Sequence, residues 1–263
     1  MTAERSVENC LRNMQKGEPA TESVAAVHDF LQSGANGFKP VVDGNGESIV
    51  LDLSAGSSLC GELLRGIGVE RFSTLVDRKM REAAARVAYG RYAEPRDLYH
   101  SDIFANAAAG KGERRDVHLG IDVFCNAGSP VFTPLDGVIE IVANNTAELD
   151  YGPLLVLRHA TGDGTPFYLL HGHLALDSVS AHRVGDRFAA GAKIAEVGLP
   201  PENGNWPPHL HLQVIADLLG LGADFPGVAY RSQLKMWLEL SPSPAAFFPD
   251  RDAAELNHSL GHR

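Results

Sequence analysis

The second half of the chain consists of short apolar runs separated by Gly and Pro, and this pattern constrains the fold more than any other feature. The runs span residues 117–124, 130–133, 137–143, 153–159, 166–173, 193–197 and 209–215. Each has the length of a β-strand, and closely spaced strands with turn residues between them are typical of antiparallel sheets. We therefore expect a mainly β fold here, a twisted antiparallel sheet or sandwich.

The first part of the chain has a different pattern. A helix is predicted from about Thr21 to Gln32, a hairpin around residues 43–46, and a second helix from about Glu70 to Tyr89. The segment after it is irregular, with Pro95, an alanine run and several glycines. These changes predict a small α/β N-terminal region at 1–90, a linker or long loop at 91–115, a main domain at 116–250 and a tail at 251–263.

Composition excludes several classes of protein. The chain of 263 residues has 23 Lys and Arg against 33 Asp and Glu, a formal charge of −10, so we expect neither nucleic acid nor an anionic membrane as a partner. No apolar run approaches the roughly 18 residues of a membrane span, and the first residues do not have the pattern of a secretory signal. Three widely spaced cysteines make no disulfide framework. These features favour a cytoplasmic location, and a homo-oligomer is compatible with them.

Chemistry-bearing residues first appear in the run 117–124. Side chains alternate between the faces of a strand, so His118, Gly120 and Asp122 share one face, while the apolar residues between them share the other. Glycine leaves open space between the imidazole and the carboxylate. A histidine and an aspartate placed in this way suit two ligands of a divalent metal.

Two further histidine pairs have the same alternation. His209 and His211 share a face of the last run, and His171 and His173 are expected to share a face of the run 166–173. Catalytic zinc sites use three N or O ligands and keep a fourth position open. A single strand histidine is usually structural, but the combination of three such patterns favours a metal site.

Two other residues have open roles. His159 either orients a ligand as an outer partner or is structural, and the second interpretation is preferred. Trp206, just before His209, either forms a wall of a substrate groove or packs its own loop.

The order of these motifs resembles the lysostaphin-type (LytM-type) zinc metalloendopeptidases over about residues 116–216. The resemblance rests on His118-x-x-x-Asp122, His173-Leu and His209-Leu-His211, and on the segments 130–138, 152–159, 184–186 and 191–198. It implies a twisted antiparallel sheet with the site in a groove framed by loops. It also implies one zinc ion held by His118, Asp122 and His211, with His173 and His209 as catalytic histidines.

The chain departs from the family pattern in two respects. His171 stands where the family commonly has Tyr, and we expect it to point into the same groove and influence substrate preference. Known cell-wall-cleaving members are generally exported, whereas this chain has no recognisable export signal. Residues 202–208 and 224–228 resemble a cytosolic subgroup of metallopeptidase-like segments fused between kinase-like and aminotransferase-like domains.

These features together predict a zinc metallopeptidase that cleaves a peptide or amide bond, most readily in a cytosolic peptide. A zinc-activated water would attack the carbonyl, assisted by the histidine pair. Two alternatives stay open. One is a zinc hydrolase acting on a small amine-containing metabolite, and the other is a non-catalytic scaffold or binding protein with this fold. The complete set of five residues favours an enzyme.

Overall fold

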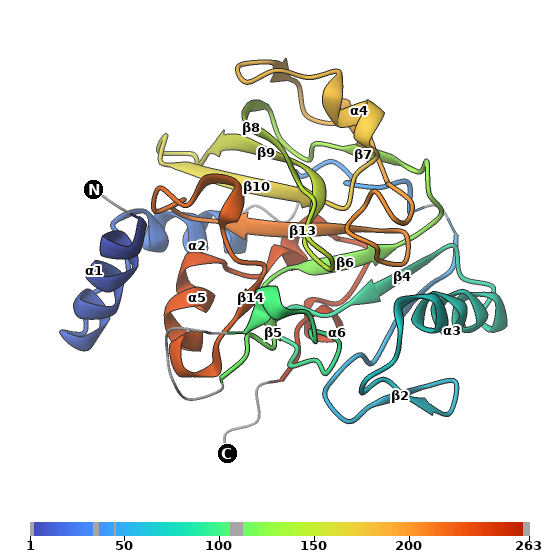
Figure 1. Ribbon diagram of the computed structural model, residues 1–263. Coiled ribbons are helices and arrows are strands. Elements are labelled where there is room, and N and C mark those ends of the chain that lie inside the picture. Colours follow the sequence, from blue (N-terminus) through green and yellow to red (C-terminus); the bar gives the residue numbers. More distant parts are fainter. Residues whose placement is uncertain (1–2, 34–36, 45, 106–112, 260–263) are drawn as a thin grey trace.

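A computed structural model of the chain describes residues 3–33, 37–44, 46–105 and 113–259. The fold is built on one eight-stranded sheet with the strand order β1-β4-β6-β13-β10-β9-β8-β11 (Figure 1). All neighbouring strands in it are antiparallel except β1 and β4, which are parallel. In this order, the strands of the sheet are Ser48–Val50, Val87–Gly90, Ile121–Phe124, His209–Ile215, Pro166–Gly172, Gly152–Ala160, Gly137–Asn145 and Arg187–Phe188. The expected mainly β fold class is confirmed.

Three two-stranded sheets complete the β structure. They pair β12 (Lys193–Glu196) with β7 (Pro130–Phe132), β14 (Val228–Ala229) with β5 (Val117–His118), and β2 (Ser58–Leu59) with β3 (Glu62–Leu63). The α-helices are α1 (Ala3–Gln15), α2 (Ser23–Ser33), α3 (Val69–Glu82), α4 (Leu176–Ser180), α5 (Leu234–Leu240) and α6 (Ala253–Leu256). The 3₁₀ turns are η1 (Asp102–Phe104), η2 (Gly222–Asp224), η3 (Arg231–Gln233) and η4 (Pro244–Phe247). No described helix combines the length and apolar character that crossing a bilayer requires.

The predicted strands agree closely with the observed ones, with one break. The run 117–124 forms two strands, β5 and β6, which pair with different partners. Leu119 and Gly120 separate them, and Leu119 is fully buried. The break turns the chain from the small sheet with β14 into the large sheet.

The first 90 residues contribute directly to the large sheet. Strand β4 pairs with β6, and β1 extends the sheet beyond β4, so the segments on either side of the expected boundary at residue 90 share one sheet. Helix α3 ends at Glu82, and residues 87–90 form a strand where the helix was predicted to continue. The local apolar spacing of residues 87–90 fits a helix as well as a strand, and pairing with β6 favours the strand.

The hairpin expected around residues 43–46 does not form, because Val42 bridges to Val131 and β1 pairs in parallel with β4. Asn45, in the expected turn, lies outside the described residues.

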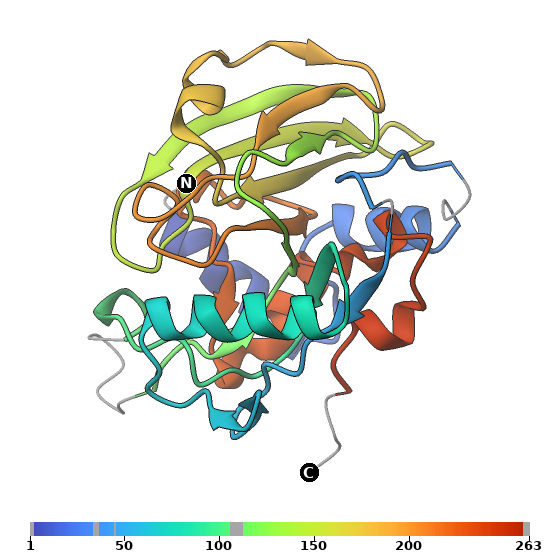
Figure 2. The same cartoon turned by 90° about the vertical axis from the view of Figure 1, so that its right-hand side faces the viewer.

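Helices cover the sheet from two sides of the molecule. Helices α1 and α2 lie on one side, and α3 lies on the opposite side (Figures 1 and 2). The buried face of α3, with Phe72, Leu75 and Val76, packs in a hydrophobic cluster that also contains Phe124 and Trp206. This cluster joins the N-terminal region to the strand ends that carry the histidines.

The C-terminal segment is also part of the fold. Helix α6 lies in the predicted tail, and its Leu256 is fully buried. The Tyr92 amide donates to the Leu256 carbonyl, and the His258 amide donates to the Tyr92 carbonyl. The chain therefore pairs with Tyr92 as far along as His258.

Candidate functional site

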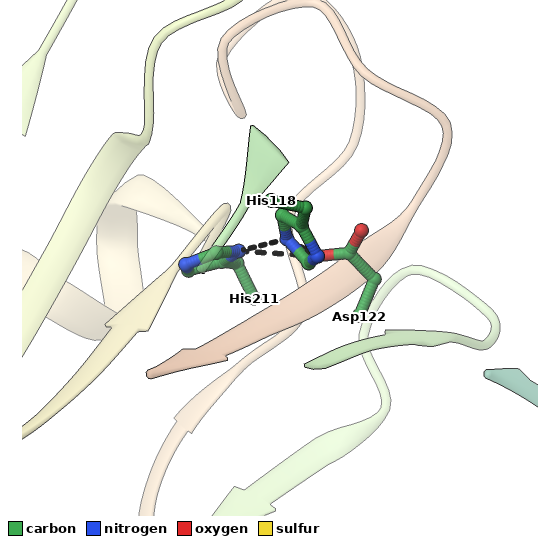
Figure 3. Close-up of side chains that lie close together, drawn as sticks. All are labelled: His118, Asp122 and His211. Atoms are coloured by element: carbon green, nitrogen blue, oxygen red, sulfur yellow. Dashed lines mark hydrogen bonds and ion pairs between the residues drawn. The ribbon is translucent and has the colours of Figure 1, made fainter. Parts of the chain in front are cut away.

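His118, Asp122 and His211 meet at the junction of three strands, β5, β6 and β13 (Figure 3). His118 Nε2 lies 3.0 Å from His211 Nδ1, and each of these nitrogens lies 3.1 Å from Asp122 Oδ1. All three residues are buried, at 2–3% exposure. The three side chains thus place one donor atom each at the corners of a nearly equilateral triangle.

Strand register and one glycine explain this convergence. Asp122 and His211 are directly paired neighbours on β6 and β13, so their side chains leave the same face of the sheet. A Cβ at Gly120 would lie 2.6 Å from both His211 Cε1 and the Leu212 carbonyl oxygen. The space that the sequence leaves at Gly120 is therefore filled by the His211 ring.

Hydrogen bonds on the far side of each ring fix which nitrogen carries the proton. His118 Nδ1 donates to the Arg91 carbonyl at 3.0 Å, and His211 Nε2 donates to Gln213 Oε1 at 3.0 Å. The Gln213 amide is itself oriented, since its Nε2 donates to the Pro226 carbonyl and to Ser241 Oγ. The two nitrogens that face Asp122 therefore carry lone pairs and no proton.

This donor set fits a zinc ion. Three electron-rich atoms lie within 3.1 Å of one another with no proton between them. Burial lowers the pKa of His118 to about 4, so its imidazole is neutral at pH 7. Ligand atoms about 2.0–2.1 Å from a tetrahedral zinc ion lie roughly 3.3 Å apart, close to the spacing seen here. A cation relieves the repulsion among the lone pairs.

The second oxygen of Asp122 is held by a buried arginine. Arg96 Nη1 donates to Asp122 Oδ2 at 2.6 Å, and Arg96 Nε donates to Glu94 Oε2 at 2.9 Å. Glu94 is fully buried and also accepts a hydrogen bond from the Leu53 amide. Burial opposes ionisation of Asp122, but the Arg96 guanidinium bonded to its carboxylate holds its pKa well below the usual range. The carboxylate stays charged, with Oδ1 turned toward the histidines.

Gly90 makes room for this arrangement. It pairs with Asp122 across β4 and β6, and a Cβ at this position would lie 2.7 Å from Arg96 Nη2. Arg96 and Glu94 lie in the segment predicted as a linker or long loop. No local sequence pattern signals that these two residues hold the Asp122 carboxylate, because their position depends on the pairing of β4 with β6.

His173 and His209 lie beside the three-residue cluster. Their ring centroids are 4.3 Å apart, and His209 Nε2 lies 3.6 Å from Asp122 Oδ1. His173 Nδ1 donates to the Asn203 carbonyl at 2.8 Å, and His209 Nδ1 donates to the Pro207 carbonyl at 2.7 Å. Burial lowers the pKa of both rings, so each is neutral with a lone pair on Nε2. Each Nε2 therefore offers a free lone pair to a proton of a nearby water or substrate.

The backbone at His173 departs from the strand to bring its ring here. Strand β10 ends at Gly172, and His173 adopts φ +61°, a left-handed conformation that residues with a Cβ rarely occupy. The side chain then turns to the metal-site face. Gly172, paired with His211, also lies on this face, where a Cβ would come within 2.9 Å of Tyr151.

The expectation that His171 points into the same groove is wrong. His171 pairs with Leu212, whose side chain leaves the face opposite to that of His211. Strict alternation from His171 to His173 fails because the strand ends between them. His159 lies on this opposite face too, with Nδ1 bonded to the Asp136 carbonyl at 2.9 Å, so it does not orient a metal ligand.

Trp206 lies next to the two catalytic candidates. Its ring centroid is 6.3 Å from those of both His173 and His209. Its amide donates to Asn203 Oδ1, and Asn203 Nδ2 donates to its carbonyl. Trp206 therefore packs its loop and also lines the cavity beside the cluster.

Comparison with known proteins adds to this geometry. The model of peptidase family M23 matches residues 116–219, a span that contains all five clustered residues. A comparison with the curated proteins found no match.

Several solved structures are similar. A zinc-containing peptidase from Vibrio cholerae is 25% identical over 42% of this chain and 30% of that one, with a TM-score of 0.29. Lysostaphin is 24% identical over 49% of this chain and 43% of that one, with a TM-score of 0.34. The lysostaphin catalytic domain from Staphylococcus simulans is 23% identical over 46% of this chain and 80% of that one, with a TM-score of 0.30. The chain thus spans less than half the length of the first two proteins.

The family match agrees with the resemblance that the spacing of His118, Asp122, His209 and His211 indicated. Residues 116–219 of this chain form a domain of peptidase family M23.

Proposed function

We propose that this protein is a zinc-dependent peptidase that hydrolyses a peptide or amide bond. The observation that carries the proposal is the meeting of three unprotonated donor atoms, from His118, Asp122 and His211, within 3.1 Å of one another. Two neutral imidazoles lie beside them. Neutral imidazoles and a carboxylate are common ligands of catalytic zinc.

A zinc ion bound there supplies a Lewis acid, which polarises a carbonyl group and lowers the pKa of a water molecule. The chain's own residues supply the proton transfers. His209, whose Nε2 lies 3.6 Å from Asp122 Oδ1, is placed to accept a proton from a water beside the cluster. The ring of His173 or His209 that carries the transferred proton on Nε2 then donates to the oxyanion of the tetrahedral intermediate and returns the proton to the leaving nitrogen.

The hydrogen bonds to backbone carbonyls keep both catalytic candidates in a single tautomer. Because the Nδ1 proton of each ring is held by the Asn203 or Pro207 carbonyl, proton exchange takes place at Nε2. His209 also stacks on Phe124 with ring planes 25° apart, which fixes the direction of its ring. These contacts prepare the site before a substrate arrives.

A small amide is the second candidate substrate, because the site adjoins a cavity of modest size that the N-terminal region helps to form. In either case the reaction is hydrolysis of a C–N bond. A scaffold without turnover is disfavoured, because such a role does not require the full set of three ligands and two oriented imidazoles.

The test is a cleavage screen with zinc-loaded protein. A mixture of short peptides and N-acyl amino acids is incubated with wild type, with His209→Ala and with a chelated sample, and new amino groups are identified by mass spectrometry. We expect cleavage by wild type alone. A zinc-loaded protein that cleaves nothing in the mixture, or equal cleavage by His209→Ala, would contradict the proposal.

A further inference from the structure

The metal-site cluster of His118, Asp122 and His211 lines a cavity of about 180 Å³. Besides the cluster, its charged and polar lining includes Arg96, Arg115, Asn145, Asp150, His173, His209 and Asp224. A large part of the remaining lining is apolar and comes from residues outside the family M23 match. These wall residues are Leu53, Phe72, Leu98, Tyr99, Ile103 and Phe104.

Aromatic rings connect this wall to the candidate catalytic residues. Trp206, beside His173 and His209, has its ring centroid 6.1 Å from that of Tyr99. The centroids of Tyr99 and Phe104 are 4.9 Å apart. An apolar surface therefore extends without a break from the imidazoles to the 3₁₀ turn η1.

The wall is part of the hydrophobic core, which makes its shape fixed. Phe72 is 2% exposed, Phe104 is 5% exposed and Tyr99 is 9% exposed, and all three belong to one cluster with Trp206. Core side chains packed in this way do not open a wide channel without the loss of their contacts. A bound group must therefore fit the cavity as it stands.

The size of the cavity selects the group that fits. An apolar cavity of roughly 150 Å³ accommodates benzene, so this one has room for one aromatic or branched aliphatic side chain. A substrate with only glycine beside its scissile bond leaves the apolar wall in contact with water. A bulky apolar group gains the free energy of burial, which amounts to roughly a 10- to 100-fold gain in affinity for a ring of this size.

We propose that the site takes an amide with one bulky apolar group, aromatic or branched, next to the scissile bond, and that residues 53–104 confer this preference. The inference rests on the proposed hydrolysis. In that reaction the water oxygen forms the new bond to the carbonyl carbon, the C–N bond breaks, and the nitrogen leaves as an amine with a proton from the water. The apolar group occupies the cavity while the carbonyl lies at the cluster.

Binding of two hydroxamates tests the preference without any turnover. Hydroxamates chelate zinc, so acetohydroxamate and phenylacetohydroxamate differ here only in the ring that enters the cavity. Titration calorimetry of the zinc-loaded protein should give about 10- to 100-fold tighter binding for the phenyl compound. Phe104→Ala should reduce this ratio by about tenfold, because the ring loses one side of its wall.

A matched pair of isoleucines keeps the test valid if Phe104→Ala fails to fold. Ile103 and Ile67 are both half-buried and both pack on the same cluster, but only Ile103 lines the cavity. Ile103→Ala should reduce the ratio about threefold or more, and Ile67→Ala should leave it unchanged.

The outcomes separate the two proposals. Equal binding of both hydroxamates to zinc-loaded protein, or a ratio that Ile103→Ala and Ile67→Ala change equally, overturns the apolar preference and leaves the peptidase proposal intact. Failure of the protein to bind zinc overturns the peptidase proposal itself.

Discussion

Replacement of Arg96 by Lys tests how Asp122 is held in the metal site. The Arg96 fork contacts two carboxylates at once, with Nε 2.9 Å from Glu94 and Nη1 2.6 Å from Asp122. Lysine keeps the charge but has one ammonium group, which does not reproduce both contacts in this geometry. The side chain is 3% exposed, so water does not take over the lost contact.

The size of the effect follows from these contacts. One hydrogen bond to a charged group inside the protein is lost, and such bonds contribute about 1.5–3 kcal/mol. We therefore expect the free energy of unfolding of the metal-free protein to fall by about that amount. Release of Asp122 Oδ2 lets the carboxylate rotate, and loss of an outer partner of a metal ligand typically lowers affinity by about 10- to 100-fold.

Two measurements check this prediction. Urea unfolding of the metal-free protein gives the stability, and competition with a coloured zinc chelator gives the zinc affinity. Arg158→Lys is the matched control, because Arg158 pairs with Glu140 at 3.1 Å with both side chains well exposed, at 46% and 39%. The control should lose less than about 1 kcal/mol and keep its zinc affinity. If Arg96→Lys bound zinc as tightly as wild type, Arg96 would not be what holds Asp122 in place.

Three further predictions follow from the site and from the opposite face of the sheet. Gly120→Ala should weaken zinc binding at least tenfold, because the new Cβ would lie 2.6 Å from the His211 ring. Gly162→Ala is the control and should leave zinc binding unchanged, because its Cβ would have no atom within 4 Å. Equal zinc affinities of the two variants would refute this role of Gly120. His209→Ala should bind zinc within a few-fold of wild type but lose about 10²- to 10⁴-fold in turnover, measured on any peptide that wild type cleaves. A loss of zinc would instead make His209 a ligand. Burial, with a smaller contribution from His159, lowers the pKa of His171 from its usual 6.5 to about 3. Between pH 6.5 and about pH 3, His171 is protonated in the unfolded chain but neutral in the folded protein. The stability contributed by the neutral ring is therefore fully present above pH 6.5, and below it the free energy of unfolding falls by about 1.4 kcal/mol per pH unit. His171→Leu should flatten the pH dependence of urea unfolding by this amount, and an unchanged slope would show that the buried ring does not titrate as described.

The features predicted well from the sequence depend on local order. Strict alternation fixes which side chains share a face, so the strand 209–215 and the shared face of His209 and His211 followed from spacing alone. Glycine at position 120 also gave a usable signal, although the His211 ring that fills the space comes from a strand almost a hundred residues later.

The features that sequence reasoning missed depend on tertiary contacts. His171 was assigned to the wrong face because the end of β10 at Gly172 and the left-handed backbone of His173 are set by neighbouring loops. Residues 87–90 continue a helical spacing but become a strand because β6 is available to pair with them. Arg96 had no signal at all, since its partners Glu94 and Asp122 come together only once that strand is in place.

Zinc titration of the metal-free protein shows whether His118, Asp122 and His211 form a metal site, with wild type and His211→Ala compared by calorimetry. This assignment predicts one zinc ion per chain for wild type and no comparable binding for the variant, which loses one corner of the donor triangle. Wild-type protein that is folded but takes up no zinc, or equal uptake by the two proteins, would contradict it.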